Sequence, residues 1–136
     1  MKKKKDISLL KDFLEEKYLL YNNKSFIPTD PIQIPHQFSK KEDKEIAGFL
    51  AATIAWGQRK SIIHNSNKLM LWMDNAPYDF IVHHSKKDLE PFKKFVHRTF
   101  NGTDCTFFIQ SLQNIYKKHG GLENAFSKGI QKKDEN

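Results

Sequence analysis

Apolar residues recur at helical spacing along almost the whole chain. They follow one another in steps of three and four residues over 7–21, 62–73 and 107–116. No segment of the sequence alternates apolar and polar residues in the way that predicts a strand. The pattern therefore predicts an all-α fold, built as an irregular multi-helix domain.

The most apolar segment indicates the centre of this fold. Ser39 and Glu42 have the spacing of a capping box, and an apolar run follows them over 46–56. Small residues within the run allow other helices to approach closely, and a helix that is apolar on all sides is normally buried. We therefore expect a buried central helix over about 40–56, ended by Gly57.

Shorter elements are expected in the rest of the chain. These are an extended, proline-containing connection over 22–38, short helices from Pro77, over 88–95 and over 122–128, and a loop over 97–104. Asn101-Gly102 predicts a turn inside that loop, and Thr103 is the expected cap of the helix that follows it.

The composition narrows the class of protein. A length of 136 residues fits a single helical domain, which we expect over 1–136 with a basic tail at 1–5 and a polar tail at 129–136. The net charge of +7 and the pI near 9.4 suit contact with nucleic acid or an acidic surface, although the basic residues are scattered. With one cysteine and no apolar run of the roughly 20 residues that a bilayer requires, we expect a cytoplasmic protein without membrane contact.

Motifs for catalysis, metals and cofactors are not found in the sequence. It contains no glycine-rich phosphate loop and no H-E-x-x-H. His83 and His84 are adjacent, so on a helix they project about 100° apart and make a poor chelate. Cys105 is explained as a small apolar residue at the start of a helix. We therefore predict no catalytic residue, metal ligand or cofactor, and the prediction leans against an enzyme for this chain alone.

Two segments carry candidate binding residues. Gln58, Arg59 and Lys60 follow Gly57 at a helix–turn–helix junction, and glutamine and arginine suit base edges and phosphates. A glycine helix stop followed by ordinary basic residues explains the same pattern, so both interpretations stay open. In the 97–104 loop, Arg98 is a candidate phosphate anchor or the ion-pair partner of a carboxylate.

Several blocks of sequence together resemble a known family. They are "DPIQIPHQFSKKEDKEIAGFLAATIAWGQRKSII", "NAPYDF", "FVHRTFNGTD" and "HGGLENAF", and they run in order over about 30–126. The resemblance is to an uncharacterised bacterial family defined only as a domain of unknown function. Longer members are roughly twice this length, and their later half resembles the helix-hairpin-helix core of base-excision DNA glycosylases. This chain matches their N-terminal half and contains no counterpart of the catalytic aspartate.

This resemblance implies a fold and a DNA-related surface. Residues 46–70 are similar to the helix–turn–helix near the start of the glycosylase core, where a polar residue reaches into DNA opposite a flipped base. Gln58 or Arg59 would occupy that place. We therefore expect a protein that binds duplex DNA, is related to DNA repair and is not independently catalytic at this length. The alternative is a non-enzymatic interaction or structural module that packs on a C-terminal half absent from this chain.

Overall fold

The chain divides into two compact units. The computed structural model describes residues 2–130, with side chains described from residue 7 onwards. One unit is Met1–Asp30 and the other is Pro31–Asn136. Met1 and residues 131–136, which make up most of the predicted polar tail, lie outside the described residues.

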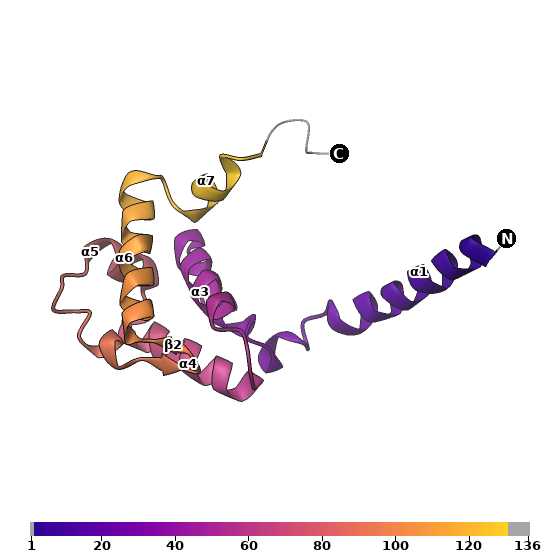
Figure 1. Ribbon diagram of the computed structural model, residues 1–136, viewed down its shortest axis with the longest axis horizontal. Helices are drawn as coiled ribbons and strands as arrows, with labels where there is room; N and C mark the ends of the chain where they lie inside the picture. Colours follow the sequence, from indigo (N-terminus) through magenta and orange to yellow (C-terminus); the bar gives the residue numbers. More distant parts are fainter. Residues whose placement is uncertain (1, 131–136) are drawn as a thin grey trace. The chain divides into compact units, whose positions relative to one another are not determined.

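The described residues are mostly helical, which confirms the predicted all-α class. In chain order the elements are α1 (Lys2–Tyr21), η1 (Ile27–Thr29), α2 (Gln33–His36), α3 (Lys41–Thr53), α4 (Arg59–Trp72), α5 (Pro77–His83), η2 (Pro91–Lys94), β1 (Val96–His97), β2 (Phe100–Asn101), α6 (Gly102–Lys118) and α7 (Leu122–Ser127) (Figure 1). The 22–38 connection, predicted as extended, contains η1 and α2, because a proline is tolerated in the first turn of a helix.

The first unit consists of α1 and η1. Residues 2–5, predicted as a basic tail, lie within α1. The apolar side chains that gave the helical period remain largely exposed: Ile7, Leu10, Leu14 and Tyr18 are each more than half accessible. A single helix cannot bury its own apolar face, so this unit has no core of its own.

The second unit is organised around α3, as the apolar run predicted. This helix contacts α2, α4, α5 and α7 and buries Ile46, Ala47, Leu50 and Ala51. Large, fully buried side chains from the other elements complete the core; they are Ile34, Leu69, Met70, Met73, Ile81, Phe92, Phe95, Ile109 and Leu112. One side of α3 stays open at the exposed Ala52, so the helix is central without being covered all round.

The central helix is shorter than the predicted 40–56. The backbone leaves helical geometry at Ile54 (φ −103°, ψ 14°), and the Thr53 hydroxyl donates to the Phe49 carbonyl at 2.8 Å. Gly57 then adopts φ +103°, a conformation that residues with a side chain rarely take. The chain therefore turns sharply over residues 54–58, and α4 begins directly after the turn.

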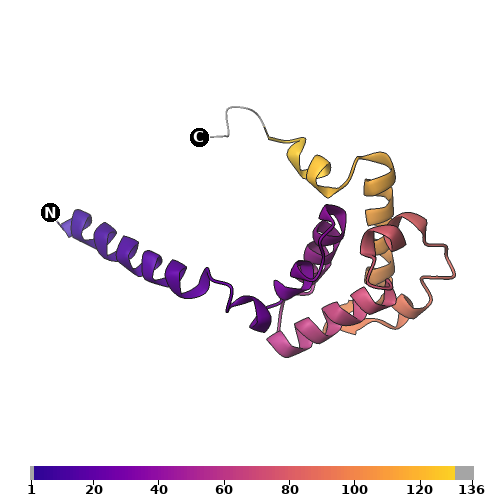
Figure 2. The same ribbon diagram turned by 180° about the vertical axis from the view of Figure 1, so that it is seen from behind.

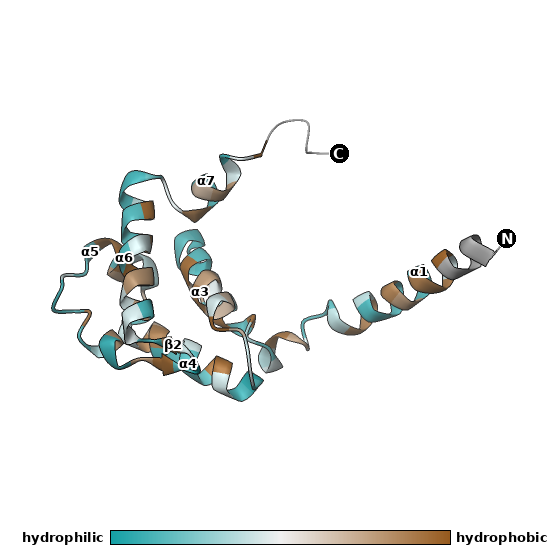
Figure 3. Ribbon diagram, viewed as in Figure 1, coloured by the Kyte–Doolittle hydropathy of each residue, from teal (hydrophilic) through white to brown (hydrophobic). Residues whose placement is uncertain are grey.

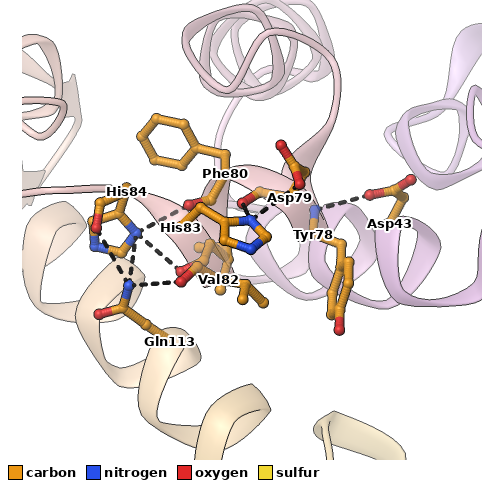
Figure 4. Close-up of polar contacts among 9 residues, drawn as sticks. Asp43, Tyr78, Asp79, Phe80, Val82, His83, His84 and Gln113 are labelled. Carbon is orange, nitrogen blue, oxygen red and sulfur yellow. Dashed lines mark hydrogen bonds and ion pairs between the residues drawn. The ribbon is translucent and has the colours of Figure 1, made fainter.

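The predicted capping box of this helix is wrong. Lys40, and not Ser39, is the extended residue before α3, and no side-chain hydrogen bond caps that end. Because the helix starts one residue later than expected, its third residue is Asp43 instead of Glu42. The Asp43 carboxylate accepts a hydrogen bond from the backbone N–H of Tyr78 at 2.8 Å (Figure 4). The side chain thus connects α3 to the start of α5.

Two further contacts hold α5 between its neighbours. On the α6 side, the Gln113 amide donates to the Val82 carbonyl at 3.2 Å, and the same amide lies near His84 (Figure 4). Tyr78 also packs edge-on against Tyr116 of α6, whose hydroxyl donates to the Glu45 carboxylate of α3 at 2.7 Å. Together with Asp43, these bonds fix the positions of α3, α5 and α6 relative to one another.

A small β-hairpin, which the sequence did not predict, precedes α6. β1 and β2 pair antiparallel, with His97 opposite Phe100. The turn lies at Arg98 and Thr99, and Arg98 takes the left-handed φ of 54°. The turn predicted at Asn101-Gly102 is therefore wrong.

That dipeptide instead starts α6. Asn101 caps the helix through a capping box with Asp104, where Thr103 was predicted as the cap. Gly102 follows Asn101 and lies against the backbone of Lys93, so close that a Cβ atom there would be 1.9 Å from the Lys93 carbonyl oxygen. The start of α6, directly after the hairpin, therefore contacts η2 through its backbone, at a distance that only glycine permits.

Candidate nucleic-acid interface

His97 joins the loop after α3 to α4 and to the hairpin. Its side chain is 3 % exposed. The Asn65 amide of α4 donates to Nδ1 at 2.9 Å, and Nε2–H donates to the backbone carbonyl of Trp56 at 3.0 Å. Both bonds are satisfied at once by one tautomer of the neutral ring, with the proton on Nε2. The hairpin and the 54–58 loop therefore form one braced surface beside α4 (Figure 1 and Figure 2).

Trp56 lies at the edge of this braced loop. The residue is 36 % exposed, and its ring meets the His97 ring edge to face, with 5.2 Å between ring centroids and 85° between planes. The sequence suggested a tryptophan that ends the apolar run, and the structure places it outside the helix. His97 holds the backbone carbonyl of Trp56, while the side chain remains partly exposed to solvent.

Arg98 reaches the same loop from the hairpin. Its side chain passes over Gly57, where an added Cβ would lie 3.1 Å from Nη1 and 3.2 Å from Cδ of the arginine. The positive φ of Gly57 and the absence of a side chain there allow this approach. The structure thus brings together Arg98 and the residues around Gly57, which are 41 positions apart in the sequence.

The other three candidates follow Gly57 directly. Gln58 is the N-cap residue of α4 but its side chain makes no capping hydrogen bond, and Arg59 and Lys60 form the first turn. All three side chains are exposed, and the start of α4 is hydrophilic in Figure 3. We call residues 56–60 together with Arg98 the loop–hairpin surface.

The loop and α4, which carry most of the loop–hairpin surface, contain no acidic residue of their own. No aspartate or glutamate occurs in the sequence from Ile54 to Met73, which covers the loop and all of α4. The first turn of α4 contains no acidic residue that would satisfy its backbone N–H groups. A helix N-terminus carries partial positive charge, so the α4 dipole adds to Arg59, Lys60 and Arg98. The geometry suits an anion such as a phosphate.

The two side chains with a strongly raised pKa are explained by packing. Burial raises the pKa of the Cys105 thiol to about 12, so this cysteine is a protonated core residue. Burial, and then the bond to Glu45, raise the pKa of Tyr116. His83 bonds back to Asp79 of its own helix (Figure 4). Within residues 7–130, no three His, Cys, Asp or Glu side chains gather as a metal site.

Sequence reasoning missed the residues that hold the surface together. His97 lay in a segment expected to be a loop, and Asn65 was one polar residue of an amphipathic helix. Their partners are 32 and 41 positions apart in sequence, and no local pattern encodes such pairings. The only available signal was the aromatic and basic composition around residues 95–100.

A second surface feature is an apolar groove at the open side of α3. It has a volume of 430 Å³ and lies where α2, α3 and α7 meet. Its apolar lining comes from Pro35, Phe49, Leu122 and Phe126, and Phe126 is 68 % exposed. Of the helices that the structure describes, none is long and apolar enough to cross a membrane.

Comparison with known proteins identifies a family without a known function. Neither the curated proteins nor the solved structures gave a match to the chain. Among protein families, the one described as protein of unknown function (DUF2400) matches residues 30–136, which covers the second unit and leaves α1 outside. The chain therefore belongs to the DUF2400 family.

Proposed function

We propose that this protein binds duplex DNA through the loop–hairpin surface. The observation that carries the proposal is the meeting of two basic segments: Arg98 lies over Gly57, directly before Arg59 and Lys60. Scattered lysines alone would favour an ordinary solvated surface, whereas a fixed group of cations beside a helix N-terminus suits the phosphate backbone. Gln58 is placed to hydrogen-bond a base edge or a phosphate.

The bracing by His97 supports the same proposal. A binding surface loses less conformational entropy on association when its backbone is already fixed. His97 fixes the loop carbonyl at Trp56 and is itself held by Asn65. The long side chains of Arg59 and Arg98 thus extend from a rigid base, as expected for residues that position a nucleic acid.

The repair-related part of the proposal rests on sequence resemblance. The helix–turn–helix over residues 46–70 resembles the start of the glycosylase core, and Gln58 or Arg59 takes the place of the residue that enters DNA there. The loop–hairpin surface contains no carboxylate that would serve as a catalytic base. We therefore propose DNA binding in a repair context, without base excision by this chain alone, in a cytoplasmic protein.

Salt titration tests the proposal. Fluorescence anisotropy of a labelled 20-bp duplex is measured at rising salt concentration. Neutralising about three phosphates gives a slope of about −3 for log K against log salt, because each phosphate contact releases counterions with a coefficient of about 0.9. Binding that is weak and falls with this slope supports the proposal. Flat titrations at low salt would overturn it.

The groove beside α3 favours a second candidate function, a protein-interaction module. Phe126 and Phe49 offer apolar surface that no described element covers fully, and an amphipathic helix is the usual occupant of such a groove. The partner in this case is a C-terminal half or another chain. Self-association in sedimentation experiments that Phe126→Ser abolishes, combined with no DNA affinity, would select this function over DNA binding.

A further inference from the structure

Trp56 is a member of the loop–hairpin surface that cation–phosphate contact does not explain. Trp56, a residue 36 % exposed, is the only aromatic residue in a surface otherwise made of glycine, glutamine, arginine and lysine. The other tryptophan of the chain, Trp72, is half-buried against Phe92 and Phe95 in the core. Burial therefore accounts for Trp72 but leaves the outward position of Trp56 without a structural reason.

The geometry leaves a face of the Trp56 indole free of His97. The two rings meet at 85°, so the edge of one points at the face of the other. If His97 presents its edge, it covers one face of the indole; if the indole presents its edge, it covers neither. In both cases at least one flat face of Trp56 is not covered by the histidine.

The backbone that carries the ring is also held in place. The Trp56 carbonyl accepts from His97, and its N–H donates to the Ile54 carbonyl at 2.8 Å. Arg98, one residue from His97, extends over Gly57, the residue next to Trp56. An exposed aromatic face on an anchored backbone, next to cations that can hold phosphates, is the arrangement with which proteins stack unpaired bases.

We propose that Trp56 stacks on an unpaired base, so that the loop–hairpin surface selects DNA containing an unpaired nucleotide over fully paired duplex. Arg59, Lys60 and Arg98 hold the phosphates that flank this nucleotide, and the indole face receives its ring. The inference rests on the proposed DNA binding and adds the class of DNA structure that is preferred. It assigns no chemistry to the base.

The test compares a 20-bp duplex with the same duplex carrying one bulged thymidine. Stacking one base on an aromatic ring is expected to improve affinity for the bulged DNA at least about fivefold. Trp56→Ala removes that preference, so that the ratio of the affinities for bulged and paired DNA falls to about one. Trp56→Phe keeps an aromatic face and retains the preference. Trp72→Phe serves as the matched control and behaves as wild type.

Fluorescence provides a readout at the ring itself. In the Trp72→Phe variant, Trp56 is the only tryptophan, and its emission is expected to be quenched by bulged DNA more strongly than by paired duplex. Equal binding of both DNAs with no effect of Trp56→Ala would overturn this inference and leave the proposed DNA binding intact. Emission that changes with protein concentration and not with DNA would identify a protein contact and also overturn it. Absence of all DNA binding would instead refute the proposed function itself.

Discussion

Replacing Gly102 with alanine tests the packing that positions the hairpin. A Cβ at residue 102 would lie 1.9 Å from the carbonyl oxygen of Lys93 and 2.3 Å from its carbonyl carbon. Real Cβ contacts are essentially never shorter than 3.0 Å, so one of the two backbones must move by more than 1 Å. Because both are rigid main chain in contact with the core, a side-chain rotation cannot relieve the overlap.

The expected cost is at least about 3 kcal/mol of unfolding free energy, the upper end of the range for overpacked sites. Gly48→Ala in α3 is the matched control, since its Cβ would meet Pro35 at an ordinary 3.6 Å. There, removal of a glycine from a helix interior is expected to stabilise the protein by about 0.5–1 kcal/mol. The same substitution should therefore have opposite signs at the two positions.

Urea unfolding followed by circular dichroism measures both effects. The midpoint should fall for Gly102→Ala and rise slightly for Gly48→Ala. The slope of the unfolding free energy against urea concentration should be unchanged in both. Gly102→Ala within about 0.5 kcal/mol of the wild type would refute the close contact between α6 and η2, since that is the size expected of an ordinary surface substitution. A comparable loss in Gly48→Ala would show that glycine replacement is harmful here for another reason.

Three further predictions follow from the same structure. His97→Ala should lower the unfolding free energy by about 2–4 kcal/mol, because it removes two hydrogen bonds and leaves a cavity, whereas the exposed His83→Ala should change it by less than about 0.5 kcal/mol; equal effects in urea unfolding would contradict the bracing role. For Cys105, the pKa of the thiol is 9.0 in the unfolded chain and about 12 when buried. The stability that the buried thiol contributes is therefore fully present below pH 9 and is lost progressively as the pH rises above it. Between pH 9 and 10 the wild type should therefore lose stability faster than Cys105→Ala, by up to about 1.4 kcal/mol per pH unit, and identical slopes would refute the burial of the thiol. Finally, deletion of residues 1–30 should leave the unfolding midpoint of the remaining chain unchanged, because the family match and the compact unit both begin at that boundary; a loss of cooperative unfolding would show that α1 belongs to the core.

The sequence predicted those features of the fold that repeat locally. Apolar spacing identified the long helices, and the run ending at Trp56 identified α3 as the central helix. The exact ends were missed because they depend on distant residues. Asp43 bonds across to α5, and the carbonyl of Trp56 is taken by a histidine from the hairpin. Such contacts cannot be inferred from spacing along one segment.

The candidate site was predicted only in part, because contacts between residues distant in the sequence also determine it. Gln58, Arg59 and Lys60 were recognised together because they are adjacent, and Arg98 was recognised separately. Their common location depends on Gly57, whose positive φ allows Arg98 to cross it, and on the buried His97. A glycine after an apolar run predicts a turn, but it does not tell which side chain will pass over that turn. Contact of these residues with DNA stays a prediction.

The most direct test of DNA binding by the loop–hairpin surface compares two variants of equal net charge. Arg59→Ala/Arg98→Ala removes two cations from this surface, and Lys86→Ala/Lys87→Ala removes two exposed cations from the loop after α5. Anisotropy titration of paired duplex at several salt concentrations gives the affinity and the salt slope of each. We predict that the arginine variant binds more weakly and has a slope smaller by about 2, while the lysine variant stays near the wild type. Equal losses in both variants would mean that binding follows net charge alone, and would contradict the assignment of the loop–hairpin surface.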